Sequence, residues 1–131
     1  MTMLSEVLAG VVAPGVHELD DTTDTAVIGE LVAERGWRLF HLDGHGIVDK
    51  ATFLAHVATA CDFPEWFGSN WDALADSLRD LSWAPASGYV LLYEHHVAYE
   101  SSPEWPMVIS IFEETTQRWD RAGVPFFVLL R

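Results

Sequence analysis

Three aspartates, Asp72, Asp76 and Asp80, recur every four residues in one segment of the chain. On a helix, residues at this spacing share a face. That face lies roughly opposite an apolar stripe formed by Trp71, Leu74, Leu78 and Leu81. Like charges four residues apart destabilise an isolated helix by about 0.2–0.5 kcal/mol per pair, and only Arg79 is near enough to offset them. The pattern alone leaves two hypotheses open: a solvated polar face, or a surface that binds the cations of a partner.

Two large aromatic residues, Trp66 and Phe67, stand just before this segment and are followed by Gly68. Ser69 or Asn70 then opens the helix, because short polar side chains accept hydrogen bonds from its first free amides. Gly68 allows the chain to bend sharply at this point. We expect one of the two aromatic residues in the core and the other at the rim of the acidic row. An aromatic anchor beside charges is typical of an interface hot spot.

Histidines and an aspartate gather at the predicted end of a strand, at His41, Asp43 and His45. Open α/β sheets bind ligands at such ends, and two histidines with an aspartate could hold zinc, helped by His95 and His96. Alternation spaces His41 and Asp43 along the strand but leaves His45 in a turn of unknown direction. We therefore expect His41 to be a core or edge histidine, and we expect no bound metal. A metal-dependent hydrolase is the rival hypothesis.

The serines carry no recognisable nucleophile motif such as Gly-x-Ser-x-Gly. We therefore expect a protein that is not an enzyme and that needs no cofactor.

Acidic residues dominate the charge of the chain, with 20 Asp and Glu against 7 Lys and Arg and a formal net charge of -13. Such a surface repels phosphate backbones, which argues against direct nucleic-acid binding. It attracts basic proteins and speeds the encounter with them. The alternative is that the acidity only keeps a small protein soluble.

Cys61 is the only cysteine, so the chain has neither an internal disulfide nor a cysteine-based zinc site. It lies in an apolar helical stretch, where a buried, inert thiol is expected. No apolar run is long enough to span a membrane, and the first residues lack the basic start of a secretory signal. We expect a cytoplasmic protein without membrane contact.

Hydrophobic periodicity and turn residues divide the chain into helices and strands. A short helix is predicted over 4–9, and a second helix, capped within 20–24 and ended by Gly36, carries Val27, Ile28, Leu31 and Val32 on one face. Strands are predicted over 38–42, 89–93 and 126–130. Further helices are predicted from the cap at Asp49, from position 69 or 70, and over 106–122, with Gly123 just past the end of the last.

Strands separated by helices imply parallel pairing through right-handed crossovers. The fold class is therefore α/β, with a three-stranded parallel sheet packed by helices and an extra helical segment at the N-terminus. The strand over 89–93 is apolar throughout, as expected of a strand buried on both faces. The length suits one domain over 1–131, with 1–36 as an N-terminal extension and 37–131 as the remainder.

The stretch Pro64-Glu65-Trp66-Phe67-Gly68-Ser69-Asn70-Trp71-Asp72-Ala73-Leu74-Ala75-Asp76-Ser77-Leu78 resembles the signature of the barstar family. Members of that family are intracellular inhibitors of barnase-type, guanyl-specific ribonucleases. The signature is long and specific, because it combines an aromatic pair, a glycine, an asparagine and two aspartates at fixed spacing. The order of elements from about Trp37 to Leu130 also fits the small α/β fold of the family.

The resemblance implies a binding role for several residues. Asp72 and Asp76 match the aspartates that engage the arginines and catalytic histidine of the ribonuclease. Trp66 matches an aromatic that packs on that region, and Asn70 matches a polar interface residue. The long helix near the C-terminus places a further acidic contact at Glu114 or its neighbour Glu113. We include Asp80 because it continues the acidic row.

Some positions depart from the best-known pattern. Trp66 and Phe67 stand where a tyrosine pair is familiar, and Arg79 replaces a small polar residue with a charge that suits a basic partner poorly. The extension over 1–36 and the long stretch from His95 to Trp105 are additional. The departures affect the identity of the partner more than the mode of binding.

The resemblance implies a protein inhibitor that forms a 1:1 complex as a monomer and blocks the active site of a secreted, basic, guanyl-specific ribonuclease with an acidic helix. The alternative function is that of an acidic adaptor or immunity protein for another basic toxin. It would use the same face of the helix, and it therefore stays open beside the hydrolase.

Overall fold

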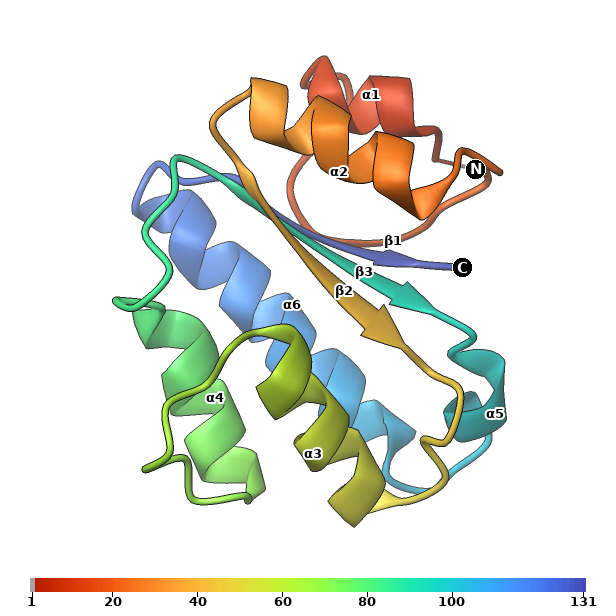
Figure 1. The fold of residues 1–131 in the computed structure, drawn as a ribbon, viewed down its shortest axis with the longest axis vertical. Helices are drawn as coiled ribbons and strands as arrows, with labels where there is room; N and C mark the ends of the chain where they lie inside the picture. The colour runs from red at the N-terminus through yellow and green to blue at the C-terminus, as the bar shows by residue number, and fades with distance from the viewer. Residues whose placement is uncertain (1) are drawn as a thin grey trace.

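The structure is a computed structural model that describes residues 2–131. Helices and strands follow one another along the chain (Figure 1), as α1 (Leu4–Leu8), β1 (Val16–Glu18), α2 (Thr25–Glu34), β2 (Arg38–Asp43), α3 (Lys50–Ala60), α4 (Trp71–Asp80), β3 (Tyr89–Glu94), α5 (Val97–Glu100), α6 (Trp105–Arg121) and β4 (Phe126–Leu130). The α/β class is confirmed, and none of these helices is long and apolar enough to cross a membrane.

The sheet has four strands in the order β1-β4-β3-β2, all of them parallel, and the prediction of three strands was wrong. The additional strand is β1, whose residue Val16 pairs with Val128 and whose residue Glu18 pairs with Leu130 of β4. Three residues are too few to show an alternating pattern, and β1 is a strand only because β4 offers it a partner. The short helix α5 was also missed.

Helices cover both faces of the sheet (Figure 1). The N-terminal helices α1 and α2 lie on one face, and α3, α4 and α6 lie on the other. The core accordingly has two parts. On the side of α1 and α2, the buried residues are Leu4, Val7, Leu8, Leu19, Ile28, Val32, Val90, Leu92, Phe127 and Leu129. The N-terminal extension therefore supplies the layer that covers this face of the sheet.

The larger part of the core lies between the sheet and the helices α3, α4 and α6. β3 and β4 contribute residues to both parts in alternation: Leu91 and Val128 lie in the larger part, while Leu92 and Leu129 lie under α1 and α2. The prediction that the 89–93 strand is buried on both faces is therefore confirmed. Of the residues predicted to share one face of α2, Ile28 and Val32 are buried in the core, whereas Val27 is 43% exposed.

The predicted caps of two helices are confirmed by the hydrogen bonds at their first turns. The Asp24 carboxylate accepts from the amide of Ala26 at the start of α2. The Asp49 carboxylate accepts from the amide of Thr52 at the start of α3. Gly123 follows α6 with a φ of 79°, in the left-handed region that favours glycine, as predicted.

Candidate functional site

The helix α4 presents its acidic row to solvent because its opposite face is packed in the core. Leu74 and Leu78 are fully buried, whereas Asp72, Asp76 and Asp80 are exposed. The indole Nε1 of Trp119, on α6, donates to the carbonyl oxygen of Leu78 at 2.8 Å. This bond satisfies a carbonyl in the last turn of α4 and fixes the helix against α6, so the aspartates stand on a rigid support.

The N-terminus of α4 is capped by Asn70. Its Oδ1 accepts from the amide of Ala73 at 2.8 Å, and its Nδ2 donates to the carbonyl oxygen of Gly68 at 3.3 Å. Of the two predicted caps, Ser69 is excluded because its φ of 52° is left-handed, whereas Asn70 has the extended backbone of a capping residue. The bend before the helix thus falls at Ser69 rather than at Gly68. Asn70 is exposed and remains available to a partner.

The aromatic pair divides as predicted. Phe67 packs against the core and lies 4.9 Å from the ring of Phe63, while Trp66 is 67% exposed. The rings of Trp66 and Trp83, on the loop after α4, meet nearly at right angles, with 6.0 Å between centroids. The indole nitrogen of Trp83 is held by the carbonyl oxygen of Cys61 at 3.0 Å. Trp83 therefore supports the exposed ring, a role that nothing in the local sequence indicates.

Arg79 connects two of the predicted contact residues. Its Nη2 pairs with Asp76 on α4, and its Nη1 lies 3.7 Å from Glu114 Oε1 on α6. Its Nε donates to the carbonyl oxygen of Ala75 at 3.2 Å, which holds the guanidinium along α4. Of Glu113 and Glu114, it is therefore Glu114 that is linked to α4, by its ion pair with Arg79. The spacing of Asp76 and Arg79, three residues apart on a helix, was the signal for part of this contact.

The remaining predicted residues make their contacts at the ends of α4 or lie open to solvent. Asp80 accepts from the hydroxyl of Ser82 at 3.2 Å, just past the helix. Asp72 is exposed in the first turn, where the helix dipole favours a negative charge. The structure thus joins Asp76 to Glu114 and leaves Trp66, Asn70, Asp72 and Asp80 exposed on α4 and its flanking loops.

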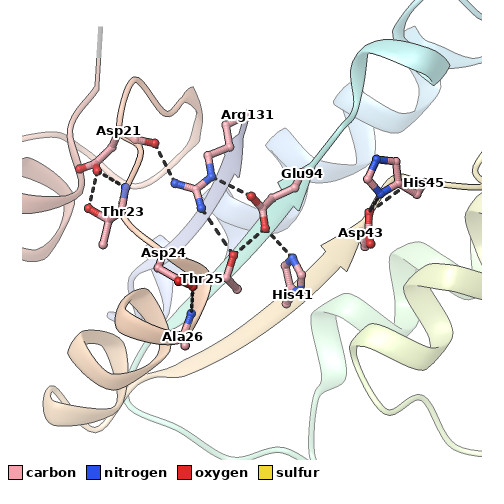
Figure 2. A network of polar contacts seen from close by, with 10 residues as sticks. All are labelled: Asp21, Thr23, Asp24, Thr25, Ala26, His41, Asp43, His45, Glu94 and Arg131. Atoms are coloured by element: carbon pink, nitrogen blue, oxygen red, sulfur yellow. Dashed lines mark hydrogen bonds and ion pairs between the residues drawn. The ribbon is translucent and has the colours of Figure 1, made fainter.

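The predicted histidine cluster divides into two groups. His41 lies exposed on β2, an edge strand of the sheet, so of the two expected placements the edge is correct. Its Nε2 lies 2.7 Å from Glu94 Oε1. Asp43 and His45 instead contact each other, 3.1 Å apart (Figure 2). His95 joins this second group through a stacked contact with His45. His96 is buried and stacks on Trp105.

Glu94 is the centre of a polar network (Figure 2). It accepts from Arg131 Nε at 2.9 Å and from Thr25 Oγ1 at 2.7 Å, while Arg131 Nη1 donates to the carbonyl oxygen of Asp21 at 2.7 Å. Burial alone would raise the pKa of Glu94, but hydrogen bonds from Thr25, Arg131 and His41 outweigh it and hold this pKa below its usual value. The network ties the N-terminal extension to β2, β3 and the end of the chain.

The structure offers little for nucleophilic chemistry at Cys61. The thiol is fully buried, as predicted, and burial raises its pKa, so the reactive thiolate is disfavoured.

His41 and Asp43 line a hollow of about 380 Å³ together with His56. Both histidines of this hollow already have a polar partner. His56 Nδ1 lies 2.7 Å from the carbonyl oxygen of Thr52, and His41 contacts Glu94.

Comparison with known proteins identifies one family. The model of the family Barstar (barnase inhibitor) matches residues 37–131. None of the curated proteins compared with the chain matches it. The family match covers α4 with its acidic row, Trp66 and Glu114, and all strands except β1. With most of its length matched, and with a parallel α/β fold that agrees, the chain belongs to the barstar family of barnase inhibitors.

Proposed function

We propose that the protein inhibits a secreted, basic, guanyl-specific ribonuclease by placing the acidic face of α4 in its active site. The contact surface comprises Trp66, Asn70, Asp72, Asp76, Asp80 and Glu114. The protein acts as a cytoplasmic monomer in a 1:1 complex and binds neither RNA nor a membrane. The supporting observation is that α4, rigidly seated on the core, exposes its three aspartates on one face, with Glu114 of α6 joined to them through Arg79.

The physical basis is charge mimicry. A ribonuclease of this type binds a phosphodiester with a cluster of arginine, lysine and histidine. Carboxylates on a rigid helix occupy the positions of the phosphate oxygens and form charge-assisted, partly bidentate hydrogen bonds to arginine. Asp72 and Asp76 take this role, and a carboxylate offers no bond that the enzyme can cleave.

Trp66 acts as the aromatic anchor of this surface. Its ring is largely exposed and is supported from one side by Trp83. Covering a tryptophan removes a large apolar area from water at a low cost in side-chain entropy, which is why such residues dominate binding energies. We infer that the ring packs beside the catalytic histidine of the ribonuclease.

Titration of the full chain into an RNA-cleavage reaction tests the proposal. With a barnase-type guanyl-specific ribonuclease at a concentration well above the dissociation constant, cleavage should fall linearly and end near one inhibitor per enzyme. A mixture that forms a complex but still cleaves RNA would favour the acidic adaptor. Absence of any complex with several such ribonucleases would contradict the proposed partner class.

A further inference from the structure

A second cluster of side chains lies at the carboxyl ends of β2 and β3. Asp43, His45 and His95 each direct one potential ligand atom to a common region, with these atoms all within 4.8 Å of one another. All three residues are exposed. The rings of His45 and His95 stack with 3.8 Å between centroids, and His45 Nδ1 lies 3.1 Å from Asp43 Oδ1.

Gly44 allows the turn after β2 to approach the turn after β3 closely, because it has no side chain. Its amide donates to the carbonyl oxygen of Glu94 at 2.7 Å, which fastens the turn after β2 to the turn after β3. A Cβ atom at Gly44 would lie 2.3 Å from the carbonyl oxygen of His95 and 2.6 Å from that of Glu94. Only glycine allows this approach.

The two histidines are held by the geometry of their turns. The amide of His45 donates to Asp43 Oδ1 at 3.0 Å, which folds the turn back on its own aspartate. His95 has a φ of 57°, in the left-handed region that glycine favours and that asparagine, aspartate and histidine enter more often than other residues. This conformation directs the chain so that His95 meets His45 across the two turns.

The donor set suits a zinc ion. Zinc binds histidine nitrogen and carboxylate oxygen at about 2.0–2.2 Å with tetrahedral geometry, so its ligand atoms stand roughly 3.4 Å apart. The ligand atoms lie within 4.8 Å of one another, so the exposed side chains must rotate to reach this spacing, and the stacked imidazoles must turn until both ring planes meet at the ion. Three protein ligands leave a fourth position for water.

We propose that Asp43, His45 and His95 form a binding site for one zinc ion, with water as the fourth ligand. The sequence alone argued against a metal site here because the direction of His45 could not be known, and the set that it considered included His41. The site lies beside α5, away from α4 (Figure 1), and does not depend on the proposed inhibition. The bound ion joins the ends of β2 and β3 and stabilises the fold.

Calorimetric titration of the chelator-treated full chain with zinc chloride tests the proposal. We expect one ion per chain, a chain that stays monomeric by size exclusion, and a melting temperature that rises with zinc concentration because the ion binds the folded state. Cobalt in place of zinc should give the visible absorption bands of a tetrahedral site. Two chains per ion, or no binding by the full chain at micromolar protein, would overturn it.

Two variants locate the ion, and each is paired with a fold check by circular dichroism. His95→Asn keeps a residue that tolerates the left-handed backbone, and His45→Ala removes the other imidazole. Each should weaken zinc binding roughly tenfold or more, since one of three protein ligands is lost. His17→Asn, a histidine on β1 whose Nε2 contacts the carbonyl oxygen of Ala13, is the matched control. Zinc affinity that is unchanged in both variants would place the ion elsewhere and refute the site.

Discussion

Arg79 contacts two carboxylates of the proposed interface, Asp76 on α4 and Glu114 on α6. Its side chain is 29% exposed and lies along the helix, held by the carbonyl oxygen of Ala75. In the free protein, this cation offsets the repulsion within the acidic row. In the proposed complex, the same charge would face the arginines and lysines of the basic partner, which would disfavour binding. Arg79 thus stabilises the free protein but should weaken its binding to a basic partner.

Arg79→Ala should therefore strengthen binding to a basic ribonuclease. At low salt, we expect the association rate constant to rise roughly twofold to tenfold, because a repelling charge is removed from the contact surface. The loss of two ion pairs whose carboxylates are exposed should lower stability by only about 0–1 kcal/mol. Stopped-flow mixing measures the rate. Arg35→Ala is the matched control, because it makes the same change in net charge at the end of α2. Equal rates in the two variants would show that only net charge matters.

Asp76→Ala should weaken inhibition more than any other single change on this face. A carboxylate buried against several cations leaves those charges unpaired when it is removed. The expected loss is about 2–5 kcal/mol of binding free energy, a range carried over from complexes that include the family's own barnase–barstar pair. Folding should change within about 0.5 kcal/mol, because Asp76 is 72% exposed and too deep in α4 to cap it. Residual ribonuclease activity and thermal unfolding measure the two effects.

The control for this variant is Glu30→Ala. Glu30 is exposed on α2, which covers the other face of the sheet from α4. Glu30→Ala removes the same charge outside the proposed interface and should leave inhibition nearly unchanged. If Asp76→Ala inhibited as well as the parent, the acidic row would be a solvated face and the interface would lie elsewhere.

Among the elements, α2 acts as the cover of one face of the sheet. Ile28 is fully buried in the core under α1 and α2, whereas Val27, its neighbour on the same helix, is 43% exposed. Ile28→Ala should destabilise the fold by about 2–5 kcal/mol, because it leaves a cavity against the sheet. Val27→Ala should change stability by about 0.5 kcal/mol or less. Urea denaturation of the pair measures the difference, and equal losses would show that α2 does not cover the sheet.

The ends of β3 and β4 carry the Glu94–Arg131 pair, which links them to the N-terminal extension. The pKa of Glu94 is lowered in the folded state. The contribution of Glu94 to stability is therefore fully present above the unfolded pKa, about 4.3–4.5. It is lost as the pH falls below that value and through the lower, folded pKa.

Glu94→Gln should remove this part of the acid sensitivity. The variant should be less stable than the parent at neutral pH, and the difference should shrink as the pH falls below about 4. Thermal unfolding between neutral and acidic pH measures it. A difference in stability that stays constant over this range would contradict the assignment to Glu94.

The charge of the whole molecule determines how it meets a partner. With a net charge of -13, the protein should attract the proposed basic ribonuclease from a distance, before any side chain makes contact. The same charge opposes compaction of the chain. The ion pairs that Arg79 and Arg131 form with carboxylates offset part of that repulsion locally.

Association with a basic ribonuclease should be fast at low ionic strength and slow steeply as salt is added. Screening acts over about 8–10 Å at physiological ionic strength, so the long-range attraction falls while contacts within the complex persist. The dissociation rate should change much less than the association rate. Stopped-flow measurements over a series of sodium chloride concentrations test this expectation. An association rate that is flat over the series would show that the charge does not steer the encounter.

Local sequence alone determined most of the elements of this protein. Periodicity located α2, α3, α4 and α6, and uninterrupted apolar runs identified β3 and β4, because helix and strand patterns are set by neighbours within a few residues. The cap at Asp49 followed from the same short-range chemistry, as did a cap within 20–24, which the structure places at Asp24. The charge of -13 and the acidic row on α4 were also readable without a structure.

Only the tertiary structure decided the features that depend on partners distant in the chain. β1 exists because β4 pairs with it, and Arg79 reaches Glu114 because α4 packs beside α6. Asp43 and His45 meet His95 because β2 and β3 are adjacent and Gly44 admits the neighbouring turn. These contacts join residues between 35 and 112 positions apart. Spacing along the chain gives no account of them, because pairing, packing and the direction of a turn arise only when the whole chain has folded.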